Sequence, residues 1–114
     1  MNLPELSVIV PVYNGYSSLL RLYEELCNTL GELEYELIFV DDASTDASLT
    51  LLREIAGADA GVTVLALREN RGQQEATLCG MAVAKGRYLA NLDDDGQHPP
   101  AYLLPMLNYL REHD

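Results

Sequence analysis

Basic residues are scarce in this 114-residue sequence, which carries 7 lysines and arginines against 18 acidic residues and has a formal net charge of −11. Such a chain offers no basic face that could displace the counterions of DNA or RNA, so a nucleic-acid partner is excluded. A small ligand that carries phosphate is compatible with this charge, provided that a positive group stands between the phosphate and the acids.

Long apolar runs and paired cysteines are lacking as well. No apolar run approaches the roughly 18 residues needed to span a bilayer, and the N-terminal MNLPELSVIV lacks the basic start and long apolar stretch of a signal peptide. We therefore expect a soluble chain that begins in the cytoplasm. Cys27 and Cys79 are isolated and do not have the spacing of a metal site, so we expect two reduced core cysteines.

The residues that are present alternate between short apolar runs and amphipathic segments. The apolar fraction of 48% is typical of one folded domain. Strands that alternate with helices favour a mainly parallel sheet covered on both faces, so we predict a three-layer, doubly wound α/β fold of the Rossmann-like type. The expected strands are 6–13, 35–42, 61–70 and 87–93, and the expected helices are 17–30, 43–57, 72–86 and a last one that opens at Pro99 or Pro100 and is kinked or delayed by Pro105.

Polar residues follow each predicted strand. In open parallel sheets the ligand lies beyond the carboxyl ends of the strands, so these residues are expected to share one edge. Ordinary solvated loops would account for part of this pattern, but not for acids at two strand ends together with an Arg and a Gly at a third. The residues are Pro11, Tyr13 and Asn14, then Asp41 and Asp42, then Asn70, Arg71 and Gly72, and finally Asp93, Asp94 and Asp95.

Three consecutive carboxylates, Asp93, Asp94 and Asp95, repel one another unless a cation lies between them. Carboxylate oxygens are hard ligands that suit Mg²⁺ or Mn²⁺, and these ions keep positions open for phosphate oxygens. Gly96 would let the backbone turn tightly beside the ion. The alternative is an acidic surface loop or a helix cap.

The other candidates each have a structural alternative. Asp41 and, more strongly, Asp42 can accept hydrogen bonds from a base or a sugar, or either can cap the next helix, for which Ser44, Thr45 and Asp46 also compete. Arg71 near a helix N-terminus favours a phosphate, or is an ordinary exposed arginine. Tyr13 can stack on a base or pack under a loop. His98 can be a metal ligand, a diphosphate contact or a plain loop residue.

Four segments together resemble the successive motifs of inverting family 2 glycosyltransferases, which have the GT-A fold. They are SVIVPVYNG, FVDDASTDAS, RENRGQQEATLCGM and LANLDDDGQHPP. The NRGQ segment and the GQHPP that follows the acids resemble more weakly the branch that transfers a sugar from a nucleotide to a polyprenyl phosphate, similar to dolichol-phosphate mannose synthase.

The resemblance implies roles by position. It makes Pro11, Tyr13 and Asp42 nucleoside contacts, puts Arg71 near the nucleotide, and makes Asp93 and Asp95 the pair that holds the metal and the diphosphate, with Asp94 between them. It also implies a UDP- or GDP-linked sugar as donor, a polyprenyl phosphate or a glycan as acceptor, and Mg²⁺ or Mn²⁺ as cofactor. Gly96 departs from the pattern, because relatives usually carry an apolar residue there.

The chain is also shorter than the resemblance implies. Family members normally continue beyond this length, and the further part supplies the acceptor site and the general base. We therefore interpret residues 1–114 as the nucleotide-sugar-binding part of a longer domain, at the cytoplasmic face of the membrane in a full-length form, with an exposed sheet edge that invites a homo-oligomer. Two alternatives stay open: a nucleotide-binding module without catalysis, and a phosphoryl-receiver domain, against which the placement of the single lysine, Lys85, argues.

Overall fold

The fold is built on a sheet of four parallel strands. The structure is a computed structural model that describes residues 3–93 and 99–114. Each strand except the last is followed by one α-helix, and the last is followed, after Pro99, by a short 3₁₀ turn and a helix. In chain order the elements are β1 (Leu6–Val12), α1 (Tyr16–Leu30), β2 (Tyr35–Asp41), α2 (Ser48–Ala58), β3 (Val62–Ala66), α3 (Gln73–Val83), β4 (Tyr88–Asn91), the 3₁₀ turn η1 (Pro100–Tyr102) and α4 (Leu103–Glu112).

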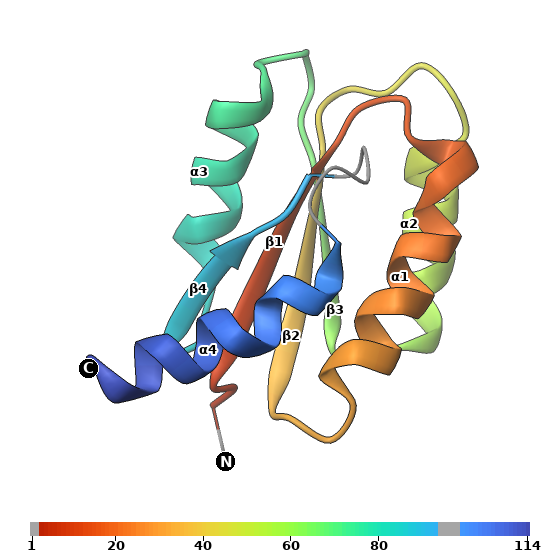
Figure 1. The fold of residues 1–114 in the computed structure, drawn as a ribbon. Coiled ribbons are helices and arrows are strands. Elements are labelled where there is room, and N and C mark those ends of the chain that lie inside the picture. The colour runs from red at the N-terminus through yellow and green to blue at the C-terminus, as the bar shows by residue number, and fades with distance from the viewer. Residues whose placement is uncertain (1–2, 94–98) are drawn as a thin grey trace.

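The strand order is β3-β2-β1-β4, so β1 lies inside the sheet and is buried along its whole length. Successive side chains of a strand point to opposite faces. Val8 and Val10 pack into a core with α1, α2 and the start of α4, whereas Ile9 packs with Ala76 of α3 on the other face. Figure 1 shows α3 alone on its side of the sheet. The predicted three-layer parallel α/β fold is confirmed.

The largest differences from the predicted boundaries are in β3 and α2. β3 ends at Ala66 rather than at residue 70, because its only described neighbour, β2, ends at Asp41, the partner of Ala66 in the register. α2 begins at Ser48 rather than at residue 43, because the intervening loop bonds to the loop after β1. The last helix is delayed as Pro105 predicted, since η1 precedes the regular turns of α4.

Side-chain hydrogen bonds and ion pairs hold the C-terminal helix against the amino ends of β1 and β4. Arg111 of α4 donates from Nε to Glu5 at 2.7 Å, and Arg87 and Tyr88 donate to Asp114. The hydrogen bond from Arg111 lowers the pKa of Glu5. The loops that follow the strands lie at the opposite end of the sheet, away from both ends of the chain (Figure 1).

Candidate functional site

Asn14 ties the loop after β1 to the loop after β2. Its Oδ1 accepts the backbone N–H of Thr45 at 2.8 Å and of Asp46 at 3.3 Å, and its own N–H donates to the Ser44 hydroxyl at 2.9 Å. Asn14 has a φ of 51°, a left-handed conformation that asparagine tolerates better than most residues. The side chain predicted to touch a nucleotide is thus engaged in shaping the loops that surround the strand ends.

Asp46 joins the first turns of α1 and α2. One carboxylate oxygen accepts the N–H of Ser48 at 2.9 Å and the other accepts the N–H of Tyr16 at 3.2 Å. Partial desolvation raises the pKa of Asp46, but the hydrogen bonds from Ser48 and Tyr16 outweigh it, and the pKa lies below its ordinary value. Of the three predicted capping candidates, Asp46 is the one that binds the first turn of α2.

Asp42 is buried at the end of β2 and points toward α3. Its Oδ1 accepts the backbone N–H of Arg71 at 2.7 Å, and its Oδ2 accepts that of Gly72 at 2.9 Å. Gly72 has a φ of 93°, which a side chain would disfavour. The carboxylate therefore fixes the backbone that leads into α3, and each of its oxygens retains a second lone pair for another donor.

Asp41 is buried on the opposite face of β2. Its Oδ2 accepts the N–H of Ser44 at 3.2 Å, while its Oδ1 has no hydrogen-bond partner in the described part of the chain. Only 2% of Asp41 is exposed, and Asp41 is not among the residues that line the hollow beside Asp42.

The guanidinium of Arg71 lies near two glutamate side chains. The group lies 2.9 Å from Glu69 and 3.8 Å from Glu75, and 55% of the side chain is exposed. The backbone N–H of Arg71 and that of Gly72 are both taken by Asp42. The predicted phosphate contact at Arg71 would therefore come from the guanidinium after it leaves Glu69.

Asp93 follows β4 and receives a hydrogen bond from the side chain of Gln73, the first residue of α3. Nε2 of Gln73 is the donor and Oδ1 of Asp93 is the acceptor. The other predicted members of the acidic motif, Asp94 and Asp95, lie outside the described residues together with Gly96, Gln97 and His98.

A small hollow of about 70 Å³ separates Asp42 from the loop after β1. Pro11 and Tyr13 line it, as the resemblance implied for a nucleoside site, and 49% of Tyr13 is exposed, so its ring is accessible to a base. Gln73 lines the same hollow. The three residues that the resemblance implies as nucleoside contacts, Pro11, Tyr13 and Asp42, thus line one hollow.

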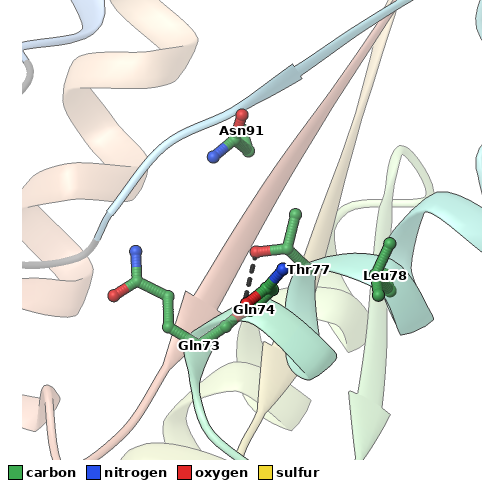
Figure 2. A pocket seen from close by; sticks show the side chains of 5 residues that line it. All are labelled: Gln73, Gln74, Thr77, Leu78 and Asn91. Carbon is green, nitrogen blue, oxygen red and sulfur yellow. Dashed lines mark hydrogen bonds between the residues drawn. The ribbon is translucent and has the colours of Figure 1, made fainter.

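A second hollow of about 330 Å³ adjoins Asp93 and is lined by Gln73, Asn91 and Tyr102, among others. A third, of about 380 Å³, lies between α3 and β4 and is drawn in Figure 2, where Gln73 and Asn91 come from the two elements that face each other. Gln73 lines all three hollows. It connects the nucleoside hollow with the acidic end of β4.

Gln73 and Asn91 were missed as individual residues. A signal for Gln73 existed in the NRGQ segment, which was used only to recognise a branch of the family. Asn91 stands two residues before Asp93 on an exposed position of β4, and nothing in its local sequence distinguishes it from other strand residues.

The candidate donors for a divalent cation are the carboxylates that follow β4 in the sequence. Within 3–93 and 99–114, no group of three or more His, Cys, Asp or Glu side chains is arranged to hold a metal ion. Asp93 is half-buried, and its oxygens are the hard ligands that Mg²⁺ and Mn²⁺ prefer. The donor chemistry of Asp93 therefore fits such an ion, while Asp95, the second ligand that the resemblance implies, lies outside the described residues.

Residues 7–114 match the family described as Glycosyl transferase family 2. The chain belongs to this family. It is 35% identical over 108 residues to the uncharacterized glycosyltransferase YkcC of Bacillus subtilis (strain 168), which covers 93% of this chain. It is 41% identical over 99 residues to the undecaprenyl-phosphate 4-deoxy-4-formamido-L-arabinose transferase of Proteus mirabilis (strain HI4320), with 84% of this chain covered.

Solved structures agree with the family 2 assignment. S. aureus TarS 1–349 in complex with UDP-GlcNAc superposes with a TM-score of 0.79 at 26% identity, over 96% of this chain and 32% of that one. The mannosyltransferase PcManGT from Pyrobaculum calidifontis, in complex with GDP-Man and Mn²⁺, superposes with a TM-score of 0.73 at 25% identity, over 83% of this chain and 28% of that one. The fold is the GT-A fold that the resemblance implied.

The family 2 chain spans about a third of the length of these curated relatives, 33% for YkcC and 30% for the Proteus enzyme. The phosphoryl-receiver alternative finds no support beside the family match. Among the helices that the structure describes, none is long and apolar enough to cross a membrane.

Proposed function

We propose that this chain is the donor-binding part of a glycosyltransferase that moves a sugar from a nucleoside diphosphate to a polyprenyl phosphate. The observation that carries the proposal is the convergence of Pro11, Tyr13, Asp42 and Asp93 on adjoining hollows at the carboxyl edge of a family 2 sheet. Ligands of parallel α/β sheets bind at this edge.

The base of the nucleoside would lie against Tyr13 and Asp42, over the small hollow between them. The accessible ring of Tyr13 offers a face for stacking, and the free lone pairs of Asp42 offer acceptors for a base N–H. Asn14, which holds the loops, and the buried Asp41 would act indirectly by shaping this hollow. Neighbours of known structure bind UDP-GlcNAc or GDP-Man, so both bases belong in a test.

The diphosphate would lie toward the acidic end of β4. A divalent cation, held there by Asp93 and Asp95, would neutralise the charge that builds up on the leaving diphosphate. Asp93 would present a carboxylate oxygen to it, and Asp94 would lie between the two ligands. Arg71 would approach a phosphate oxygen once it exchanged its exposed contact with Glu69.

The acceptor in this proposal is a polyprenyl phosphate, because the Proteus relative is named as an undecaprenyl-phosphate transferase. A phosphate oxygen is already anionic, so it needs little help from a base in an inverting displacement. The reaction would take place at the cytoplasmic face of a membrane. We expect the chain by itself to bind a donor and to transfer no sugar, because transfer also requires an acceptor to be held in line with the donor.

Calorimetry of UDP and GDP binding with Mn²⁺ or with a chelator tests the donor site. We expect binding that needs the metal, because an acidic chain repels a bare diphosphate. Asp95→Asn should weaken that binding by about tenfold or more, since a lost charge-assisted contact costs about 1.5–3 kcal/mol. The control Asp46→Asn should leave affinity nearly unchanged. Equal affinity with and without metal would contradict the proposal.

A transfer assay with undecaprenyl phosphate or dolichyl phosphate separates a binding module from a complete enzyme. Measurable transfer by the purified chain, at a rate that Asp95→Ala abolishes, would show that the acceptor site lies within these 114 residues. Binding without transfer would support the donor-binding role that we propose.

A further inference from the structure

Gln73 occupies a position that connects the two parts of the proposed donor site. Its side chain lines the hollow beside Tyr13 and Asp42, and it also lines the hollow beside Asp93. In Figure 2 the side chain of Gln73 extends from the N-terminal end of α3 toward the end of β4. No role was assigned to it on the basis of the sequence.

The backbone of Gln73 is held rigidly although its side chain is exposed. Asp42 binds the N–H groups of both residues that precede it, Arg71 at 2.7 Å and Gly72 at 2.9 Å. The carbonyl of Gln73 accepts the hydroxyl of Thr77 at 2.9 Å within the first turn of α3. When the backbone is fixed, the side-chain amide can be held in one position with little further loss of conformational entropy.

The amide of Gln73 reaches a single carboxylate oxygen, Oδ1 of Asp93. The contact defines the orientation of the amide, because only the NH₂ group can donate to a carboxylate. The donor is also uncharged. A lysine or arginine in this position would form an ion pair with Asp93 and would compete with a cation, whereas an amide fixes the carboxylate and leaves its charge in place.

We propose that Gln73 is a positioning residue that orients the Asp93 carboxylate for a divalent cation. One oxygen of Asp93 is held by the amide, and the second is left to face the ion. This inference rests on the proposed function, because it concerns the same cation. It adds to the proposed donor site a role for a residue that lines both of its hollows.

Electron paramagnetic resonance of free Mn²⁺ measures the effect directly on the purified chain, with UDP and with GDP in separate titrations. Gln73→Met keeps the length of the side chain and removes its hydrogen bond. We expect its dissociation constant for Mn²⁺ to rise about tenfold or more, as is usual when a partner of a metal ligand is lost. Gln74→Met is the matched control, since Gln74 is the next exposed glutamine and has no hydrogen bond to Asp93.

A second measurement needs no variant and reports on position rather than stability. In ¹⁵N-labelled wild-type chain, the side-chain amide signals of Gln73 should shift when Mg²⁺ is added without a nucleotide, while those of Gln74 should stay in place. A glutamine that only lines the nucleoside hollow would not respond to the ion alone.

Two negative results have different meanings. In the first, Asp93→Asn loses Mn²⁺ but Gln73→Met and Gln74→Met bind it with equal affinity. This result would overturn the role of Gln73 and would leave the proposed donor site intact. If the wild-type chain and Asp93→Asn both fail to bind Mn²⁺ with either nucleotide, the proposed function itself fails, and the role of Gln73 fails with it.

Discussion

Asp42 holds Arg71 by its backbone, while the guanidinium of Arg71 pairs with a different acid. The Asp42 Oδ1 lies 2.7 Å from the Arg71 N, and the guanidinium lies 2.9 Å from Glu69. Both partners of the guanidinium contact are more than half exposed, and such pairs contribute only about 0.2–1 kcal/mol. The backbone is therefore fixed, and the charged end can change partners at little cost.

Glu69→Gln should tighten metal-dependent binding of UDP or GDP by about two- to fivefold. The substitution removes the carboxylate that competes with a phosphate for Arg71, and the lost Arg71–Glu69 ion pair is worth a fraction of about 1 kcal/mol. Calorimetry on the purified variant measures the change. Glu25→Gln is the matched control, since Glu25 pairs with Arg21 in an exposed contact on α1. Weaker binding by Glu69→Gln would mean that Arg71 does not approach the diphosphate.

Two glycines in helices should respond to alanine in opposite directions. A Cβ on Gly80 of α3 would lie 2.5 Å from Cγ2 of Ile9 and 3.2 Å from that of Val40, so Gly80→Ala overpacks the helix–sheet contact and should cost about 1–3 kcal/mol. A Cβ on Gly57 of α2 meets nothing within 4 Å, so Gly57→Ala should gain about 0.5–1 kcal/mol through helix propensity. Urea unfolding of both variants checks the signs.

Stability should fall as the pH rises from about 10 to 12, the ordinary tyrosine pKa being about 10. Burial raises the pKa of Tyr35 to about 12, and the hydrogen bond to Asp59, at 2.6 Å, raises that of Tyr23 further. The unfolded chain then releases phenol protons that the folded chain retains, so the free energy of unfolding decreases with increasing pH.

Urea midpoints between pH 9 and 12, a range chosen to bracket the ordinary tyrosine pKa of about 10, measure this loss. The double variant Tyr23→Phe, Tyr35→Phe should lose less stability over the range than the wild type. Tyr109→Phe, at an exposed position of α4, should behave as the wild type does. A wild-type stability that stays constant to the top of the range would contradict the assignment.

The β4 edge should mediate self-association of the purified chain. β4 pairs with β1 on one side, and Leu89 on this strand is 38% exposed. An unpaired strand edge with an apolar side chain favours pairing with another chain, and a lysine on the edge opposes it. Sedimentation velocity should show a dimer or larger species for the wild type and a shift toward monomer for Leu89→Lys. The control Thr63→Lys, on the other edge strand, should leave the distribution unchanged.

Elements with strong local patterns could be predicted from the sequence. The apolar runs around Val8 and Ile38 are enough to predict buried strands. Because these strands are parallel, Asp42 and Asp93 lie at the same edge of the sheet independently of the loop conformations. For that reason the fold and the position of the candidate site followed from the chain alone. The three capping candidates before α2 were also recognised, although not which of them would bind the helix.

Contacts between loops far apart in the sequence could not be predicted in the same way. Asn14 binds Thr45, 31 positions away, and it also accepts the N–H of Asp46, whose carboxylate binds Ser48 at the start of α2. Asp42 was read as a ligand group, yet its carboxylate also binds two backbone N–H groups of another loop. The Gln73–Asp93 pair requires α3 and the end of β4 to be adjacent, and no local sequence pattern encodes this distance.

The ion pairs that hold the last residues of the chain at the amino ends of the strands make this protein convenient to immobilise. Arg111 binds Glu5 next to β1, and Asp114 binds Arg87 and Tyr88 at the start of β4. A linker or a dye attached after Asp114 would emerge away from the end of the sheet that carries the loops after the strands (Figure 1). A chain anchored to a sensor chip in this orientation would present its ligand-facing loops to the solution.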